Sequence, residues 1–273
     1  MKRVDGRSND QLRKIKVVKD YLSHPLSSVM IEAGGTKLIC AVSLDPKVPP
    51  WMKAQKVSGG WVTCEYGMLP ASTHERMKRE ASSGKQGGRT MEIQRLIGRS
   101  FRSVIDLQKL GQNTIYIDAE VIDADGGTRC GGITGASIAL QLAFNSEVWK
   151  SQFGPSPMRE NVAAVSVGIV NGEPVLDLCY EEDSTAEVDM NVVMTESGKF
   201  VEVQGTAERQ PFDRKQLDEL LALAECGLKK IFEIQRKIIS GFEVKEHDAP
   251  KHHAPRPGAK LGSLGDVLGN IEL

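Results

Sequence analysis

The sequence lacks any apolar run close to the roughly 20 residues that a membrane-spanning helix requires. Its first stretch, MKRVDGRSND, is polar and lacks the apolar segment of a secretory signal. The 273 residues are 40% hydrophobic and 26% charged, as in ordinary globular proteins. These features predict a cytoplasmic protein with no membrane partner.

Cysteine is also scarce and follows no pattern. The five cysteines are odd in number and scattered, and no two form a Cys-x-x-Cys pair. This arrangement argues against a disulfide framework or a zinc knuckle and indicates reduced thiols. The cysteines are Cys40, Cys64, Cys130, Cys179 and Cys226.

A strong net charge is missing as well, because the formal sum is −1. The sum alone argues against a nucleic-acid partner, but the distribution is uneven. Between His74 and Arg102 the sequence is rich in Arg and Lys, whereas between Glu173 and Met190 it has seven acids and no Lys or Arg. Charges that cancel in the sum need not cancel in space. The two segments are therefore either two solvated faces or a basic surface and an acidic site.

Hydrophobic spacing indicates hairpins and helices in irregular order. Apolar runs around glycine-containing turns predict hairpins over 27–44 and 162–178, and alternation predicts a strand over 114–123. Helical spacing predicts helices over 91–107 and after Pro211. This order favours an α+β domain with mixed sheets packed against helices over a doubly wound parallel sheet.

Two polar segments complete this organisation. Residues 71–90 are basic and glycine-rich near their end, which predicts mostly loop. From Gly241 onward the composition shifts to His, Pro, Gly and Lys. We therefore expect a catalytic domain over 1–240 and a flexible tail over 241–273.

The segment DADGGTRCGGITGA at 123–136 joins a predicted strand to a predicted helix. The start of a helix presents unpaired N–H groups and the positive end of the helix dipole. Glycine allows a close approach of the backbone, Thr128 adds a hydroxyl donor, and Arg129 can fork onto two phosphate oxygens. The segment is either a site for a small anion or a tight turn with an incidental arginine.

The acidic run LDLCYEEDSTAEVDM offers two candidate carboxylates. Asp177 lies on a predicted strand, and Asp183 follows six residues later. Carboxylates suit Mg²⁺, which commonly takes one or two of them together with water and phosphate oxygens. The alternative is a charged turn exposed to solvent.

Basic residues on the predicted helix and in the preceding loop match a phosphate-rich polymer, since each phosphate contact adds salt-dependent affinity. A solvated polar face is the competing interpretation. The candidates are Arg76, Arg79, Arg95 and Arg99.

Taken together, long motifs in chain order carry a specific resemblance. They are RVDGR, GWVTCEYGMLP, GKQGGRTMEIQRLIGRS, DADGGTRCGGITGA, VAAVSVGIVNGEPVLDL and DMNVVMTESGKFVEVQGTAE. They span nearly all of 1–240 and resemble RNase PH of the bacterial type, a family of phosphate-dependent 3′→5′ exoribonucleases that trim transfer RNA precursors. The resemblance implies the RNase PH fold, an α+β domain like that of a ribosomal protein, and a homohexameric ring built as a trimer of dimers.

The resemblance also assigns roles to residues. Inorganic phosphate would bind to Arg89, Gly127, Thr128 and Arg129. Asp177 and Asp183 would hold Mg²⁺, with Mn²⁺ as the alternative metal, and would act in catalysis together with Arg129. RNA or neighbouring subunits would contact Arg76, Arg79, Arg95 and Arg99.

Two positions depart from the family pattern. Ala71 stands where the family usually has arginine, and Arg209 replaces a usual glycine. The first departure leaves open a non-catalytic RNA-binding ring subunit of the same fold, and a hydrolytic two-metal nuclease is a further alternative. The retained candidates favour phosphorolysis, in which the nucleophile is already an anion and needs orientation more than activation.

Overall fold

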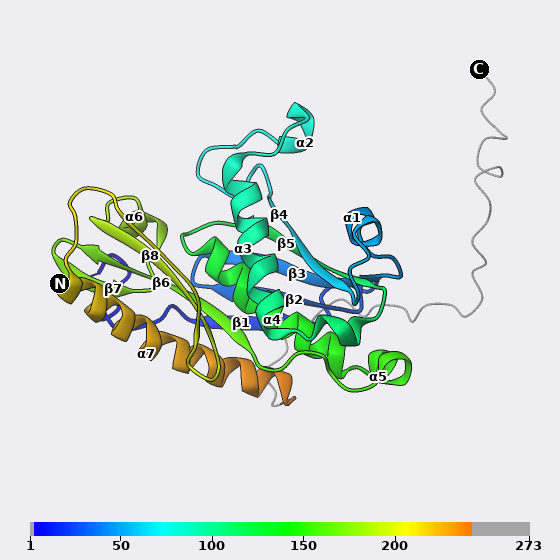
Figure 1. The fold of residues 1–273 in the computed structure, drawn as a ribbon. Coiled ribbons are helices and arrows are strands. Elements are labelled where there is room, and N and C mark those ends of the chain that lie inside the picture. Colours follow the sequence, from blue (N-terminus) through cyan, green and yellow to red (C-terminus); the bar gives the residue numbers. More distant parts are fainter. Residues whose placement is uncertain (1–2, 242–273) are drawn as a thin grey trace, which may run out of the picture.

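The computed structural model describes residues 3–241 and places them in two sheets with helices packed between and beside them (Figure 1). The first sheet has the order β1-β2-β3-β5-β4. Only the β4–β5 pair is parallel, and the other neighbours in this sheet are antiparallel. Its strands are β1 (Ile15–Lys19), β2 (Ser27–Ala33), β3 (Thr36–Asp45), β4 (Trp61–Met68) and β5 (Thr114–Asp123).

The parallel pair needs a crossover connection, and helix α3 (Gly88–Val104) provides it. The short helix α2 (Glu80–Ser83) precedes α3, and the 3₁₀ turn η1 (Leu107–Leu110) follows it. The apolar stripe of α3 is buried in the same core as the inward-facing residues of β5. The small helix α1 (Pro50–Ala54) lies between β3 and β4 in the chain.

The second sheet is antiparallel, with the order β7-β6-β8-β9. The long helix α7 (Arg214–Ile239) packs against it along an apolar stripe and contributes to the second core (Figure 1). A single turn of helix, α6 (Tyr180–Asp183), lies between β7 and β8 in the chain. The strands are β6 (Val162–Val170), β7 (Glu173–Leu176), β8 (Val188–Thr195) and β9 (Phe200–Ala207).

Helix α4 (Thr128–Asn145) connects the two halves, since it contacts β2 and β3 of the first sheet and β6 of the second. It is buried on nearly all sides, which explains why its sequence shows no polar stripe. Gln235 of α7 is fully buried and donates to the carbonyl oxygens of Thr134 and Val162 at 3.2 and 3.0 Å. Helix α5 (Glu147–Phe153) follows α4.

The α+β class with mixed sheets is confirmed, and both predicted hairpins and the strand over 114–123 are present. The helix predicted over 91–107 begins earlier, at Gly88, and ends at Val104. Strand β1 was not predicted. The predicted tail lies outside the described residues apart from Gly241, so the boundary there stays a prediction. Within 3–241, no helix is both long and apolar enough to cross a bilayer.

Close packing of α4 on the first sheet generates a stability prediction. A Cβ atom at Gly135 would lie 2.8 Å from Cys40 Sγ and 2.9 Å from Ile31 Cγ2. We expect Gly135→Ala to lower the free energy of unfolding by about 1–2 kcal/mol in urea titrations, because overpacking of about 2–3 kcal/mol outweighs a helix-propensity gain of about 1 kcal/mol.

Gly88→Ala is the matched control, since a Cβ there has nothing within 4 Å. It should leave stability unchanged or slightly raised. Equal effects of the two substitutions would contradict the close contact assigned to α4.

Candidate active site

A polar cavity of about 460 Å³ brings together cationic and anionic side chains from both halves of the fold. Arg89 near the start of α3 and Arg129 in the first turn of α4 line it. Asp183 at the end of α6 and Asp189 on β8 line it as well. Arg209 and Glu208 line it too, so the cavity combines three guanidinium groups with three carboxylates.

The Arg129 side chain is only 13% exposed and is held by neutral and acidic acceptors. Its Nη1 donates to Oε1 of Gln204 and lies 3.6 Å from Oε1 of Glu92. Gln204 in turn donates to Glu92 at 2.6 Å. The guanidinium is thus oriented, and an incoming anion would compete with Glu92 for its charge.

The carboxylates of Asp183 and Asp189 are partly removed from water. Burial raises the pKa of Asp189 to about 6, and the charge of Asp183 adds to this effect. Burial also raises the pKa of Asp183, although Arg89 and Arg129 act in the opposite direction. Two like charges at short range in a partly desolvated place are the electrostatic condition that a bound cation relieves.

The donor set fits Mg²⁺ or Mn²⁺. No group of three or more His, Cys, Asp or Glu side chains in the described part of the chain is arranged to hold a metal ion. A cation between Asp183 and Asp189 would therefore complete its shell with water and phosphate oxygens, as Mg²⁺ commonly does. Asn191, which donates to Asp189 Oδ2 at 3.4 Å and lines the cavity, helps to fix that carboxylate.

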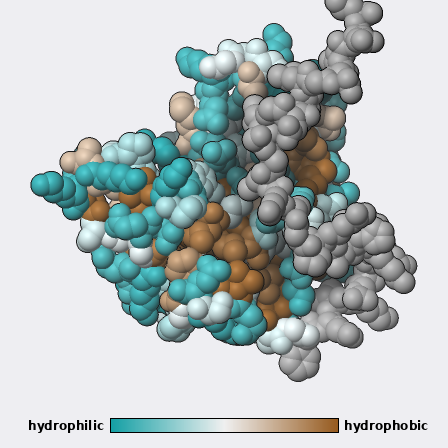
Figure 2. Space-filling view, turned by 90° about the vertical axis from the view of Figure 1, so that its right-hand side faces the viewer, coloured by the Kyte–Doolittle hydropathy of each residue, from teal (hydrophilic) through white to brown (hydrophobic). Residues whose placement is uncertain are grey.

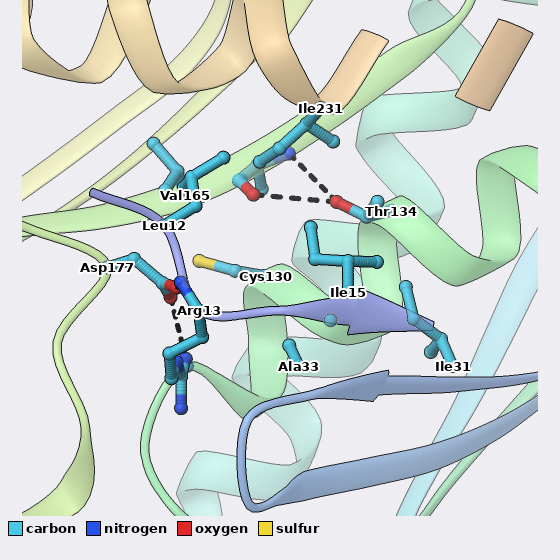
Figure 3. Close-up of a pocket in the computed structure, with 13 residues that line it drawn as sticks. Leu12, Arg13, Ile15, Ile31, Ala33, Cys130, Thr134, Val165, Asp177 and Ile231 are labelled. Atoms are coloured by element: carbon cyan, nitrogen blue, oxygen red, sulfur yellow. Dashed lines mark hydrogen bonds and ion pairs between the residues drawn. The ribbon is translucent and has the colours of Figure 1, made fainter. Parts of the chain in front are cut away.

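Asp177, predicted as the partner of Asp183, lies elsewhere. It lines a separate small cavity in which Arg13 faces it (Figure 3). Asp177 Oδ1 accepts from Arg13 Nη2 and its Oδ2 from the Arg13 backbone N–H, both at 2.7 Å. The structure does not bring Asp177 and Asp183 together. The carboxylates that line the cavity with Asp183 are Asp189 and Glu208. Asp189 and Asp177 are both six residues from Asp183, so the acidic run alone does not distinguish them.

The glycine turn before α4 is tightly built. Gly126 and Gly127 have φ of +75° and +64°, and a Cβ at Gly126 would lie 2.7 Å from the carbonyl oxygen of Leu178. Thr128 is buried, and its hydroxyl oxygen accepts from Tyr66 at 2.9 Å. The turn therefore places Arg129 at the cavity, whereas Gly127 and Thr128 are not among the residues that line it.

The four arginines predicted to contact RNA are all exposed. Arg79 lines a second cavity, of about 420 Å³, which Arg89 also lines. Arg99 on α3 points toward β9 and pairs with Glu202 at 2.6 Å. Arg95 lies on α3 one turn before Arg99, and Arg76 lies in the loop that follows β4. Their RNA contacts stay predictions.

The two departures from the family pattern have different surroundings. Ala71 is exposed in the loop after β4. Arg209, just beyond the end of β9, lines the polar cavity with Arg89 and Arg129. That departure adds a third cation to the site.

Comparison with known families agrees with this architecture. Residues 11–144 match domain 1 of the 3′ exoribonuclease family, RNase PH, and residues 160–226 match its domain 2. The chain belongs to the RNase PH family. In the RNase PH domain division, Arg89 and Arg129 lie in domain 1, and Asp183 and Asp189 lie in domain 2. The cavity is therefore built from both domains.

Solved structures show the same fold at low identity. Rice (Oryza sativa) Rrp46 has a TM-score of 0.70 and 17% identity, covering 87% of this chain and 100% of that one. The Archaeoglobus fulgidus exosome with RNA bound to the active site gives 0.72 and 21%, covering 87% and 92%. An archaeal exosome core gives 0.66 and 20%, covering 86% and 91%.

The raised pKa of Asp189 generates a prediction for metal binding. We expect Mn²⁺ affinity, measured by electron paramagnetic resonance titration, to fall as the pH drops from about 7 to about 5, because the metal must displace a proton from a group with pKa about 6. Asp189→Asn should weaken binding and flatten this dependence. Asp218→Asn, on the exposed face of α7, is the control. A wild-type Mn²⁺ affinity that does not change between pH 7 and pH 5 would contradict the role of Asp189 in metal binding.

Proposed function

We propose that the protein is a phosphorolytic 3′→5′ exoribonuclease that removes nucleotides from RNA 3′ ends as nucleoside diphosphates. The observation that supports it best is the cavity that sets Arg89 and Arg129 of domain 1 against Asp183 and Asp189 of domain 2. The arginines bind the attacking inorganic phosphate. The carboxylates take up the divalent cation that accompanies the scissile phosphate.

The reaction balances without any other co-reactant. An oxygen of hydrogen phosphate forms a bond to the phosphorus of the last phosphodiester. The bond between that phosphorus and the 3′ oxygen of the preceding ribose breaks. The proton carried by hydrogen phosphate ends on the released 3′ hydroxyl, and the reverse reaction adds a nucleotide from its diphosphate.

The lining of the cavity suits an anionic nucleophile. Among its described lining residues there is no His or Cys that could serve as an activated nucleophile or its base. Two anions that repel each other must instead be oriented and neutralised, which is what a forked guanidinium does. Removing one preorganised donor of this kind typically costs about 3 kcal/mol, or about a hundredfold in rate.

Asp183 and Asp189 are the residues that would hold Mg²⁺. When bound, the ion would neutralise charge on the scissile phosphate and orient it. Asp177 is left out of this set because Arg13 occupies both of its oxygens.

The RNA would approach over the second cavity, which shares Arg89 with the first. Lys78, Arg79 and Lys85 from the loop before α3 line it. These basic side chains beside the phosphate pocket are suited to the backbone of a single-stranded 3′ end, although Glu65, Glu80 and Glu120 line the same cavity. We propose transfer RNA precursors as the substrates and the cytoplasm as the location, in line with the family resemblance.

We also propose that the chain assembles as a homohexameric ring. Trp51 on α1 and Val148 on α5 are exposed apolar side chains, and these two helices lie on the same side of the molecule (Figure 1). Figure 2 looks onto that side and shows hydrophobic residues gathered in its centre. Gathered apolar surface of this kind is typical of contact surfaces between subunits.

A non-catalytic RNA-binding ring subunit of the same fold is the alternative. The exposed Ala71, in place of an arginine, is the feature in its favour. Such a subunit is expected to have lost a cation or an acid from the cavity. Here Arg89, Arg129, Asp183 and Asp189 all line it, which favours the enzyme.

The products of RNA digestion test this proposal. With a single-stranded RNA, Mg²⁺ and inorganic phosphate, we expect nucleoside diphosphates, identified by chromatography, and no monophosphates. Omitting phosphate should stop the reaction. Monophosphates formed without phosphate would indicate a hydrolytic nuclease, and no products in either case would favour the non-catalytic subunit.

Replacing Arg129 by Lys tests the role of the guanidinium fork. We expect Arg129→Lys to lower kcat/KM for phosphate about a hundredfold, because Lys offers a point charge and not two parallel donors. RNA affinity, measured by fluorescence anisotropy without phosphate, should change little. Arg214→Lys on α7 is the matched control, and an equal loss of RNA affinity and turnover in Arg129→Lys would contradict the assigned role.

A further inference from the structure

A buried ion pair joins the two family domains next to the active-site turn. Arg13 belongs to domain 1 and Asp177 to domain 2, and they are 6% and 7% exposed. Asp177 accepts from both the backbone N–H and the Nη2 of Arg13, each at 2.7 Å (Figure 3). The pair therefore fixes both the chain entering β1 and the turn that follows β7.

The same guanidinium also holds the glycine turn before α4. Arg13 Nη1 donates to the carbonyl oxygen of Asp125 and lies 3.5 Å from that of Gly126. Thr36 adds a hydroxyl donor to the Gly126 carbonyl at 2.6 Å. Because a trans peptide unit is planar, its carbonyl oxygen and the following amide hydrogen point in opposite directions. Holding these carbonyls therefore fixes the direction of the amides of Gly126 and Gly127.

The glycine turn before α4 is also hydrogen-bonded to α6, the helix that carries Asp183. The Asp125 carboxylate accepts from the backbone N–H of Tyr180, the first residue of α6, at 3.1 Å. Arg3 forms a two-pronged contact with Glu182, at 2.7 and 2.6 Å. Arg3 also donates to the carbonyl oxygens of Leu176 and Asp177, at 2.8 and 3.1 Å. One ionic network thus touches the turn before Arg129 and the turn before Asp183.

Asp177 itself is placed for this task and not for metal binding. Both of its carboxylate oxygens have Arg13 as a partner, and it does not line the cavity that contains Asp183 and Asp189. Its φ of +55° lies in the left-handed region, where Asp and Asn are tolerated better than most residues. Arg7 supports the same bend by donating to the Asp177 carbonyl oxygen at 2.9 Å.

We propose that Arg13 and Asp177 are positioning residues that lock the glycine turn before Arg129 in domain 1 onto the acid-bearing turn of domain 2. This inference rests on the proposed function, because it assigns the two residues a role in placing phosphate relative to the metal carboxylates. It predicts that the pair matters for phosphate affinity and turnover and not for the affinity of the metal.

Two matched substitutions test it in the full-length protein. Asp177→Asn keeps the shape and the left-handed backbone but removes the charge that holds Arg13. Arg13→Lys keeps the charge but cannot reach the carboxylate and the turn carbonyls together. Lys14→Gln, one residue away and exposed, is the control for loss of charge. Circular dichroism establishes that each variant is folded before binding is measured.

The readouts are equilibrium affinities for inorganic phosphate by calorimetry and for Mn²⁺ by paramagnetic resonance. We expect both variants to bind phosphate about tenfold more weakly, in proportion to a lost charge-assisted hydrogen bond, and to bind Mn²⁺ within about twofold of wild type. The double variant should bind phosphate no more weakly than the weaker-binding single variant, because the two residues act through one contact. Asp183→Asn and Asp189→Asn should show the opposite pattern, with Mn²⁺ affinity reduced.

Weaker Mn²⁺ binding by Asp177→Asn with phosphate binding unchanged would overturn the proposal and make Asp177 a metal ligand. Additive losses in the double variant would overturn it too, since the residues would then act independently. Both affinities are measured without RNA. A wild-type protein that binds both ions yet forms no diphosphates would therefore contradict the proposed function and still decide the role of Asp177.

Discussion

The architecture depends on opposite charges from two domains being held in register across one cavity. Domain 1 supplies Arg89 and Arg129, and domain 2 supplies Asp183 and Asp189, so neither domain has the whole site. Helix α4 packs against both sheets and provides the shared apolar core. The Arg13–Asp177 pair adds a directional link that apolar packing cannot supply, because the hydrophobic effect has no preferred angle.

The cost of that link suggests what it does. Moving two charges out of water is expensive, and well-packed apolar residues in the same place are often at least as stable. Arg13 and Arg3 nevertheless sit almost wholly buried, each with several carbonyl or carboxylate acceptors. A network that contributes little stability but defines several hydrogen-bond directions is better explained by the geometry it fixes.

Charges in the site are not fully compensated by the protein's own groups. The charge of Asp183 disfavours the charged form of Asp189, and Glu92 partly neutralises Arg129. A divalent cation would relieve the first imbalance, and an anion would replace Glu92 in the second. The two ligands therefore favour each other's presence, which is the arrangement that a reaction between two phosphate groups requires.

Much of the fold followed from local patterns in the sequence. Gly34-Gly35 and Asn171-Gly172 marked hairpins because positive φ at these turns suits few other residues. Helix α4 was harder to delimit, since a helix buried on all sides has no polar stripe to mark its ends. Strand β1, only five residues long and containing two lysines, gave too short an alternation to stand out.

The site was only partly predictable, for a geometric reason. Arg89 and Arg129 were identified and do share a cavity. Asp177 and Asp189 lie in the same acidic run, and their spacing does not reveal which carboxylate joins Asp183. The bend at Asp177, with its positive φ, turns that side chain to Arg13 in the other domain. Contacts over such sequence distances depend on the tertiary fold and leave no local signal.

In the proposed reaction orthophosphate, held by the arginines of domain 1, is the attacking group. Phosphate labelled with oxygen-18 tests it directly when the nucleotide product is analysed by ³¹P nuclear magnetic resonance. Attack by phosphate would leave labelled oxygen on the β-phosphorus and in the bridge to the α-phosphorus. Unlabelled nucleotide, the product of attack by water, would contradict this role of phosphate.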